Sequence, residues 1–515
     1  MTPAPSRPDD ELREECPGDR TRRGFLRDGT AGLTLLTLLA QGGLFGAAAR
    51  AAAAAAAGDP RASDPLAPRP QHFPAKAKHC IFLFMFGGPS QMDLFDPKPE
   101  LNQRDGQTAD IEVRRHDVHP AVLLGSQRSF KQYGQTGGWC SDAFPKLSAH
   151  MDKLAVIKSL YTDSFAHGSA VLQMNSGQAL QGHPAMGSWL TYALGTENRD
   201  LPGFVVMHDQ RGGPISGPTN WSSGYMPAAY QGTLLRSTGQ PLLYLSPDAA
   251  AGGRGGMSRA MQLDQIETLN RLNAEHLAAR AGDSELSARM ASYDLAYRMQ
   301  ESAPEALDIE KESEETRRGY GLYEPKGSHS LSIGPAPFGR QCLIARRLVE
   351  RGVRFVQIYN GGGHQQQTWD AHQGVEENLS IHCPETDQPI AMLLADLERT
   401  GLLEETLVIW GGEFGRQPVS QEAVAGQDKN SGGRDHNPKG FTMWMAGAGI
   451  KPGSVGETDE LGSEAVVERH HIRDLHATVL QLMGLDTHKL TYRYGGLERK
   501  LTGVIEPEII KGVLA

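Results

Sequence analysis

Short apolar runs recur along the chain, and most of them stop at glycine or at a polar turn. Such runs are typical of strands buried on both faces of a parallel sheet. Between them lie segments whose apolar residues repeat at helical spacing, which predicts helices that pack on the sheet. The pattern therefore predicts an α/β fold with a mostly parallel central sheet and helices on both faces. The predicted strands cover residues 80–86, 153–160, 204–207, 242–245, 355–359, 407–410 and 441–445.

The helical patterns differ in how much apolar surface they offer. Ile390, Leu393, Leu394 and Leu397 have the spacing of a helix that docks on a sheet, and this helix is predicted to begin near Pro389. Residues 376–387, just before it, are predicted to form a loop. In contrast, residues 257–299 are rich in helix formers and charges, which predicts two or more helices with solvated faces.

The amino-terminal segment has a different character. Arg22 and Arg23 precede a mildly apolar run and an alanine tract, a pattern that resembles a twin-arginine export signal. A membrane anchor is the alternative, but the run is short and broken by polar residues and glycines. We expect recognition by the twin-arginine export machinery, a periplasmic or extracellular location and no stable membrane span after processing. The expected organisation is a signal peptide at 1–57, a Pro-rich linker at 58–74 and a folded part at 75–515 with a helical and loop insertion at about 210–330.

Charge and cysteine content narrow the range of partners. The formal net charge is −10 and no block of basic residues occurs, so nucleic acid is not an expected partner. Four cysteines follow the leader without the C-x-x-C spacing of many metal sites, and their disulfide state stays open. They are Cys80, Cys140, Cys342 and Cys383.

Polar residues with metal-ligand chemistry follow several predicted strands. The carboxyl ends of parallel strands meet at one edge of a sheet, so these residues are expected to converge there. Imidazole and carboxylate together suit Zn²⁺, with Mn or Fe as alternatives, and one or two ions. The candidates are Asp93, His167, His364, Asp370, His372, Glu413, Asp435 and His436.

Each candidate also has a second interpretation. Asp93 and the nearby Asp96 are as well suited to capping turns as to binding a metal. His372 and His436 could be hydrogen-bonded interior histidines. Asp435 could orient His436 without binding the ion, and His364 could lie at the rim of the pocket. Arg416 could bind a substrate anion or pair with Glu413.

Four motifs together resemble the DUF1501 family, an uncharacterised branch of the alkaline phosphatase and sulfatase superfamily. They are Pro89-Ser90-Gln91-Met92-Asp93, Trp369-Asp370-Ala371-His372, Gly412-Glu413-Phe414-Gly415-Arg416 and Gly433-Arg434-Asp435-His436-Asn437-Pro438. The resemblance covers nearly all of the chain after the leader. It implies an alkaline phosphatase-like fold over 75–515 and metal-assisted hydrolysis of phosphate or sulfate esters. By position it implies that Asp370, His372 and His436 hold one metal and that Glu413 helps to hold a second.

The sequence departs from the superfamily pattern at two places. Gly87 and Gly88 stand where the first strand normally ends in a metal-binding aspartate, so Asp93 would have to reach in from the loop. His167 stands where a nucleophilic Ser, Thr or Cys is expected, so it could be an extra ligand or itself a covalent nucleophile. The sulfatase signature that yields formylglycine is absent from the chain after the predicted leader, which argues against a true sulfatase.

These observations favour an exported, metal-dependent hydrolase-like protein that acts on small-molecule or polysaccharide esters, with His167 and Arg416 as its catalytic residues. The alternative is a non-catalytic, metal-stabilised relative that binds glycans or another protein. The missing nucleophile favours the alternative, whereas the set of Asp370, His372, Glu413 and His436 favours the hydrolase.

Overall fold

The computed structural model describes residues 64–114, 117–239, 241–242, 258–279, 284–363, 365–421 and 432–515. Arg22 and Arg23 of the predicted export signal and the candidate ligand His364 lie outside the described residues. The strand predicted at 242–245 also falls outside them, apart from its first residue.

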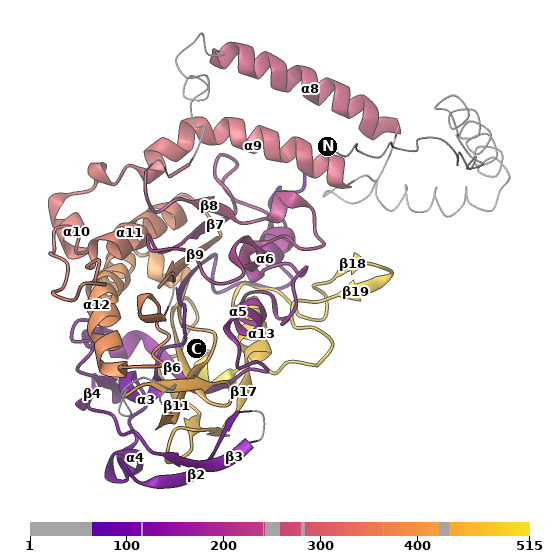
Figure 1. The fold of residues 1–515 in the computed structure, drawn as a ribbon. Coiled ribbons are helices and arrows are strands. Elements are labelled where there is room, and N and C mark those ends of the chain that lie inside the picture. The colour runs from indigo at the N-terminus through magenta and orange to yellow at the C-terminus, as the bar shows by residue number, and fades with distance from the viewer. Residues whose placement is uncertain are drawn as a thin grey trace, which may run out of the picture.

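A nine-stranded mixed sheet forms the centre of the molecule (Figure 1). Among its described strands only β13 runs against its neighbours, β10 and β6, and the other pairings are parallel. The predicted α/β fold with a mostly parallel sheet is therefore confirmed. In spatial order the strands are β14 (Gly453–Val455), β6 (Leu154–Tyr161), β13 (Phe441–Gly447), β10 (Thr406–Gly411), β1 (His79–Met85), β9 (Phe355–Asn360), β7 (Phe204–Met207) and β8 (Thr233–Leu235), with β17 (His470–His471) also paired to β6.

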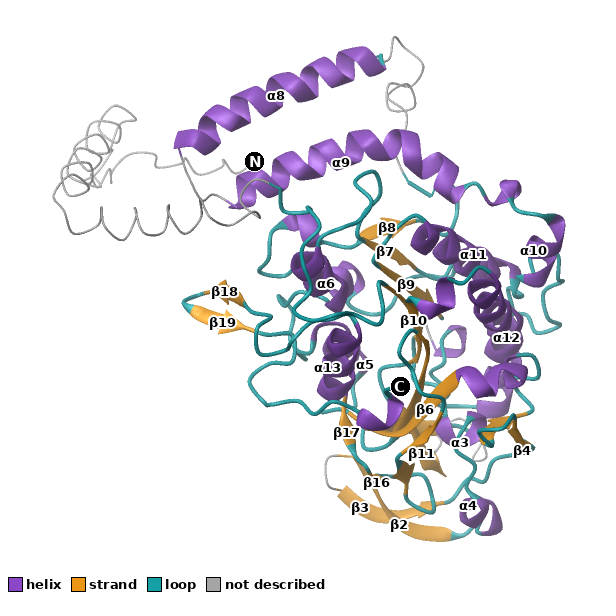
Figure 2. Cartoon of the chain, turned by 180° about the vertical axis from the view of Figure 1, so that it is seen from behind, coloured by secondary structure: helices purple, strands orange, loops and turns teal. Residues whose placement is uncertain are grey.

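The central strand β1 contributes side chains to two hydrophobic cores, one on each face of the sheet. Ile81, Leu83 and Met85 belong to one core, and the alternating Phe82 and Phe84 belong to the other. The first core is covered by α9 (Ser284–Leu307), α11 (Ala336–Glu350) and α12 (Val375–Arg399), and the second by α5 (His167–Ser176), α6 (Met186–Leu194) and α13 (Ile472–Leu482) (Figure 2). The continuous apolar runs in the sequence arise because both faces of these strands are buried.

The register of the sheet brings three strand ends to one edge. Met85 at the end of β1 pairs with Asn360 at the end of β9, and Phe84 pairs with Gly411 at the end of β10. The chain segments that follow these residues carry Gly87, Asp370 and Glu413. The sheet therefore delivers the predicted site residues to a common place.

Helix α12 corrects the loop that the sequence predicts at 376–387. The helix runs unbroken from Val375 to Arg399 and contains Pro384 and Pro389 in its interior. A proline inside a helix costs about 3 kcal/mol. Burial of the helix face that includes Leu379, Cys383 and Leu393 against the sheet offsets that cost.

Smaller elements surround the sheet. Helix α8 (Arg259–Ala279) packs along α9 in the predicted helical insertion, which continues into α10 (Glu314–Gly319). Two-stranded ribbons pair β2 (Thr108–Arg114) with β3 (Asp117–Val122), β4 (Phe130–Tyr133) with β5 (Gly138–Ser141), β11 (Gly415–Ser420) with β12 (Arg434–Asn437), β15 (Glu457–Thr458) with β16 (Ala465–Val467) and β18 (Tyr492–Tyr494) with β19 (Leu497–Arg499). Short helices precede the first ribbon, α3 (Gln91–Leu94) and α4 (Pro99–Gln103).

Cys80, Cys140, Cys342 and Cys383 are free, buried thiols. Burial raises the pKa of the Cys80 thiol well above its usual range. Within the described part of the chain, every helix is too short or too polar to span a bilayer.

Candidate metal centre

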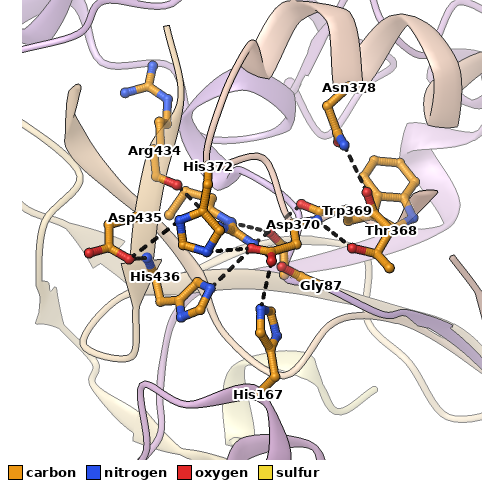
Figure 3. Close-up of polar contacts among 12 residues, drawn as sticks. Gly87, His167, Thr368, Trp369, Asp370, His372, Asn378, Arg434, Asp435 and His436 are labelled. Carbon is orange, nitrogen blue, oxygen red and sulfur yellow. Dashed lines mark hydrogen bonds and ion pairs between the residues drawn. The ribbon is translucent and has the colours of Figure 1, made fainter. Parts of the chain in front are cut away.

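Three histidines and one aspartate meet at the edge of the sheet where β1, β9 and β10 end (Figure 3). One potential ligand atom from each of the four residues lies within 4.8 Å of the others. His167 begins α5, Asp370 and His372 lie on the loop after β9, and His436 lies on β12. The four residues come from three distant parts of the sequence.

Each of the three imidazole rings is held by its Nδ1 atom. His167 Nδ1 lies 2.6 Å from a Glu413 carboxylate oxygen, and His436 Nδ1 lies 2.7 Å from the carbonyl oxygen of Phe165. His372 Nδ1 contacts the side-chain oxygen of Gln421 and lies 3.7 Å from Asp435. Because all these partners accept hydrogen bonds, Nδ1 carries the proton in each ring.

The opposite ring nitrogens all point at the Asp370 carboxylate. The Nε2 atoms of His372 and His436 lie 2.9 and 3.1 Å from Asp370 Oδ1, and His167 Nε2 lies 3.2 Å from Oδ2. With Nδ1 protonated, a neutral ring presents an Nε2 lone pair to these oxygens, and two lone pairs repel. A cation between them, either a proton or a metal ion, removes the repulsion.

This arrangement fits a transition-metal ion. Three imidazole nitrogens and a carboxylate form a ligand set that Zn²⁺ favours, and ligating histidines typically donate their other N–H to a protein acceptor. His167 Nε2 is a buried atom with no hydrogen-bond partner among the described residues, which also suits a ligand position. The geometry therefore meets the chemical requirements of the predicted metal centre.

The pKa values of the cluster reflect competing effects. Burial lowers the pKa of His436 to about 4, although the Asp370 contact opposes the shift. Burial also acts to lower the pKa of His167, but its contacts with Asp370 and Glu413 outweigh burial and raise the pKa to about 9. For Asp370, burial is outweighed by Arg416 and the three histidines, so its pKa falls far below the usual range. Metal binding would displace the His167 proton.

Arg416 supports Asp370 from inside the protein. Its guanidinium lies 2.8 Å from Asp370 Oδ1 and also donates to the carbonyl oxygens of Gly87, Gly88 and Arg434. The side chain is wholly buried. The predicted pairing of Arg416 with Glu413 is therefore replaced by pairing with Asp370, and the predicted contact with a substrate anion does not fit this burial.

Glu413 occupies a supporting position next to the cluster. Besides His167, its two carboxylate oxygens accept hydrogen bonds from the backbone N–H of Gly87 at 3.0 and 3.2 Å. It lies outside the group of four ligand atoms, and its contact with Nδ1 orients His167. Its predicted part in a second metal site stays a prediction.

Gly87 explains why the first strand ends without an aspartate. A Cβ atom at this position would lie 2.5 to 2.8 Å from backbone atoms of Trp369 and Asp370, and its φ is +116°. The loop that carries Asp370 thus occupies the space that a side chain at the end of β1 would need.

Asp93 is also placed differently from the prediction. It is wholly buried and pairs with Arg434, whose Nε lies 2.9 Å from Asp93 Oδ2, and it accepts a hydrogen bond from Ser90. Asp96 pairs with Lys98 at 3.1 Å. Neither carboxylate belongs to the cluster of His167, Asp370, His372 and His436.

Other residues of the site carried little signal in the sequence. Asp435 accepts the backbone N–H of His436 at 2.9 Å, and the role that the sequence predicts for it, to orient His436, stays a prediction. Gln421 and the carbonyl of Phe165 were not predicted, because a side-chain amide at a strand end and a backbone oxygen have no motif. The pairing of Arg434 with Asp93 was not predicted either. Both residues lie within the four motifs, but nothing in the sequence shows that these two distant side chains meet.

The chain was compared with known families and structures. The family described as a protein of unknown function (DUF1501) matches residues 77–514. No curated protein matches the chain.

Several solved structures are similar to the chain at low identity. The lipoteichoic acid synthase LtaP from Listeria monocytogenes is 9% identical with a TM-score of 0.33, covering 82% of this chain and 76% of LtaP. A variant of TAB5 alkaline phosphatase with Mg bound is 12% identical with a TM-score of 0.33, covering 80% and 99%. The PsFucS1 sulfatase from a Pseudoalteromonas species is 11% identical with a TM-score of 0.33, covering 84% and 73%. The match over residues 77–514 establishes the family, and the chain belongs to DUF1501.

Proposed function

We propose that this protein is an exported, metal-dependent hydrolase that acts on phosphate or sulfate esters. The observation that carries the proposal is the convergence of three Nε2 atoms on the Asp370 carboxylate, with each Nδ1 held by a protein acceptor. His167, Asp370, His372 and His436 would hold the ion, and Zn²⁺ suits this ligand set best. When bound, such an ion acts as a Lewis acid that polarises an ester oxygen or water.

The chain's own residues prepare the site for this role. Glu413 fixes the orientation of His167, and Phe165 does the same for His436 through its carbonyl oxygen. Arg416 holds the Asp370 carboxylate ionised and fixed in place. Ligands that are positioned in advance lose little entropy when the ion binds.

The non-catalytic alternative keeps one specific observation in its favour. Arg416 is buried and its donors are taken up by backbone carbonyls and Asp370, so it is not free to bind a substrate anion. A metal that only stabilises the fold would be compatible with this arrangement.

Metal content and ester turnover separate the two proposals. Purified full-length protein is analysed by mass spectrometry for metals and assayed on generic phosphate and sulfate monoesters, beside His436→Ala and the surface control His488→Ala. The hydrolase proposal expects about one transition-metal ion per chain and turnover, both reduced at least tenfold in His436→Ala only. Bound metal without turnover would favour the non-catalytic alternative, and wild-type protein that binds no transition metal would contradict both.

A further inference from the structure

A groove of about 500 Å³ lies at the carboxyl ends of β7 and β8. Met207 and Leu235, the last residues of these strands, line it together with the first residues of α11, Ala336 and Pro337. We call it the arginine groove and define it by Arg236, Ser237, Glu310, Arg317, Tyr323 and Arg340, which also line it. Figure 1 shows β7, β8, α10 and α11 gathered in one part of the molecule.

The arginine groove shares its sheet edge with the metal centre. Strands β1, β9, β7 and β8 are consecutive, parallel neighbours, and the cluster forms where β1 and β9 end. Adjacent strands lie about 4.8 Å apart, so the groove begins roughly 5 to 15 Å along the edge from the metal centre. Ligands of open α/β sheets bind at this edge.

One short segment connects the two places. Gln210, just after β7, lines the groove, and Gly212 packs against the glycine turn that leads to Asp370. The contact is close, because a Cβ atom built on Gly362 would lie 2.1 Å from the carbonyl oxygen of Gly212. A ligand seated in the groove therefore lies one turn away from the loop that carries Asp370.

The groove carries a surplus of positive charge. Arg236 and Arg340 are exposed, and their side chains have no ion-pair or hydrogen-bond partner among the residues that the structure describes. Arg317 is already paired with Glu310. The positive end of α11 adds to the field of the two available guanidinium groups, which bind sulfate, phosphate and carboxylate with two parallel hydrogen bonds.

The remaining lining is typical of a sugar site. Gln210 and Ser237 offer amide and hydroxyl groups, and Tyr323 exposes 49% of its surface. Gln210 and Ser237 can bond sugar hydroxyls, and the Tyr323 ring, over which the guanidinium groups of Arg317 and Arg318 lie, lines the same groove. The overall charge of −10 makes nucleic acid a poor competitor for the same groove.

We propose that the arginine groove binds a second anionic group of the substrate, and that this substrate is an anionic oligosaccharide carrying more than one charged group. The inference rests on the proposed ester hydrolysis for its link to catalysis. The ester to be cleaved lies at the metal centre, while Arg236 and Arg340 hold a charged group of a neighbouring sugar unit.

The test measures binding without turnover. Calorimetry on the full-length protein compares a sulfated heparin-derived tetrasaccharide with its desulfated counterpart, for wild type and for Arg236→Gln/Arg340→Gln. The matched control is Arg271→Gln/Arg289→Gln, which removes two exposed arginines from α8 and α9. We expect wild type to prefer the sulfated form, and Kd to rise at least tenfold with a weaker salt dependence in the groove variant alone.

A second measurement tests whether Arg236 and Arg340 act only on substrates long enough to reach the groove. Metal content and turnover of a small monoester should be unchanged in the groove variant, because that substrate does not reach the groove. The inference is overturned if wild type does not bind the sulfated form, if the groove and control variants bind alike, or if a single-stranded oligonucleotide of equal charge binds as tightly. Sulfate-dependent binding in a protein that hydrolyses no ester would refute the hydrolase proposal and leave the anion site standing.

Discussion

Asp370 is the residue that the rest of the metal centre contacts. His167, His372 and His436 approach it from three sides through Nε2, and Arg416 approaches from within. A buried carboxylate without such partners would be strongly destabilised. At the scale of single residues, the site therefore depends on side chains that hold these partners in place, and two of them can be tested.

Glu413→Gln should weaken metal binding while leaving the fold intact. The amide keeps an acceptor for the Gly87 N–H but loses the charge that holds the His167 Nδ1 proton. Loss of such a supporting contact typically lowers metal affinity by about 10- to 100-fold. Competition with a chelating dye measures the affinity, and Glu460→Gln, at an exposed acid, is the control. Unchanged affinity in Glu413→Gln would contradict the orienting role.

Gly87→Ala should destabilise the protein and displace Asp370. The new Cβ would lie 2.5 Å from the backbone nitrogen of Asp370, at a φ of +116° that disfavours side chains. We expect a loss of about 3 kcal/mol or more in the free energy of unfolding, together with loss of metal. Gly106→Ala is the matched control, because its φ is +77° but the space around it is open. It should cost only about 1 kcal/mol by denaturant unfolding.

At the scale of elements, three small units present the candidate ligands. The first turn of α5 presents His167, the loop after β9 presents Asp370 and His372, and the ribbon of β11 and β12 presents His436 opposite Arg416. Helix α13 packs behind α5 and holds its carboxyl end, because His476 Nε2 donates to the Met174 carbonyl oxygen at 2.7 Å.

The contact between α13 and α5 should make stability depend on pH. Burial lowers the pKa of His476 to about 4 from its ordinary value of 6.5. Between these values the unfolded chain binds the proton and the folded chain does not, so this stability is full above pH 6.5 and is lost as the pH falls toward 4. The loss should reach about 3 kcal/mol.

Unfolding in denaturant at several pH values tests this contribution. His476→Gln keeps a donor for Met174 but does not titrate, so its stability should fall less than that of wild type between pH 6.5 and 4. The exposed variant His488→Gln should retain the wild-type profile. Parallel profiles for wild type and His476→Gln would show that His476 does not contribute.

At the scale of the whole molecule, the candidate metal centre joins segments from residue 167 to residue 436. A ligand that binds only the folded state stabilises it by RT ln(1 + [L]/Kd), or about 4 kcal/mol at a thousandfold excess over Kd. Chelation should therefore lower Tm, and Zn²⁺ should restore it more effectively than Mg²⁺. In calorimetric scans His436→Ala should show little response to either treatment. A wild-type Tm that is insensitive to chelation would argue against a structural contribution of the ion.

Export also concerns the whole chain and stays a prediction. Arg22→Lys/Arg23→Lys should retain the protein inside the cell if the paired arginines are read by the twin-arginine machinery. Cell fractionation with immunodetection measures the distribution. Arg13→Lys/Arg20→Lys, which changes two other leader arginines, should be exported as wild type is.

The sequence by itself determined most strands of the central sheet and the residue types that gather at its edge. Buried strands such as β1 and β7 need continuous apolar runs, which can be recognised in the sequence. Imidazole and carboxylate groups that follow such strands have metal-binding chemistry, and this too can be recognised from residue type alone. Tertiary structure decided the rest. It extended α12 through two prolines because burial outweighed their cost, and it paired Asp93 with Arg434. It also placed Glu413 behind His167. The sequence could not predict these contacts, because they depend on which side chains from distant segments meet in the folded chain.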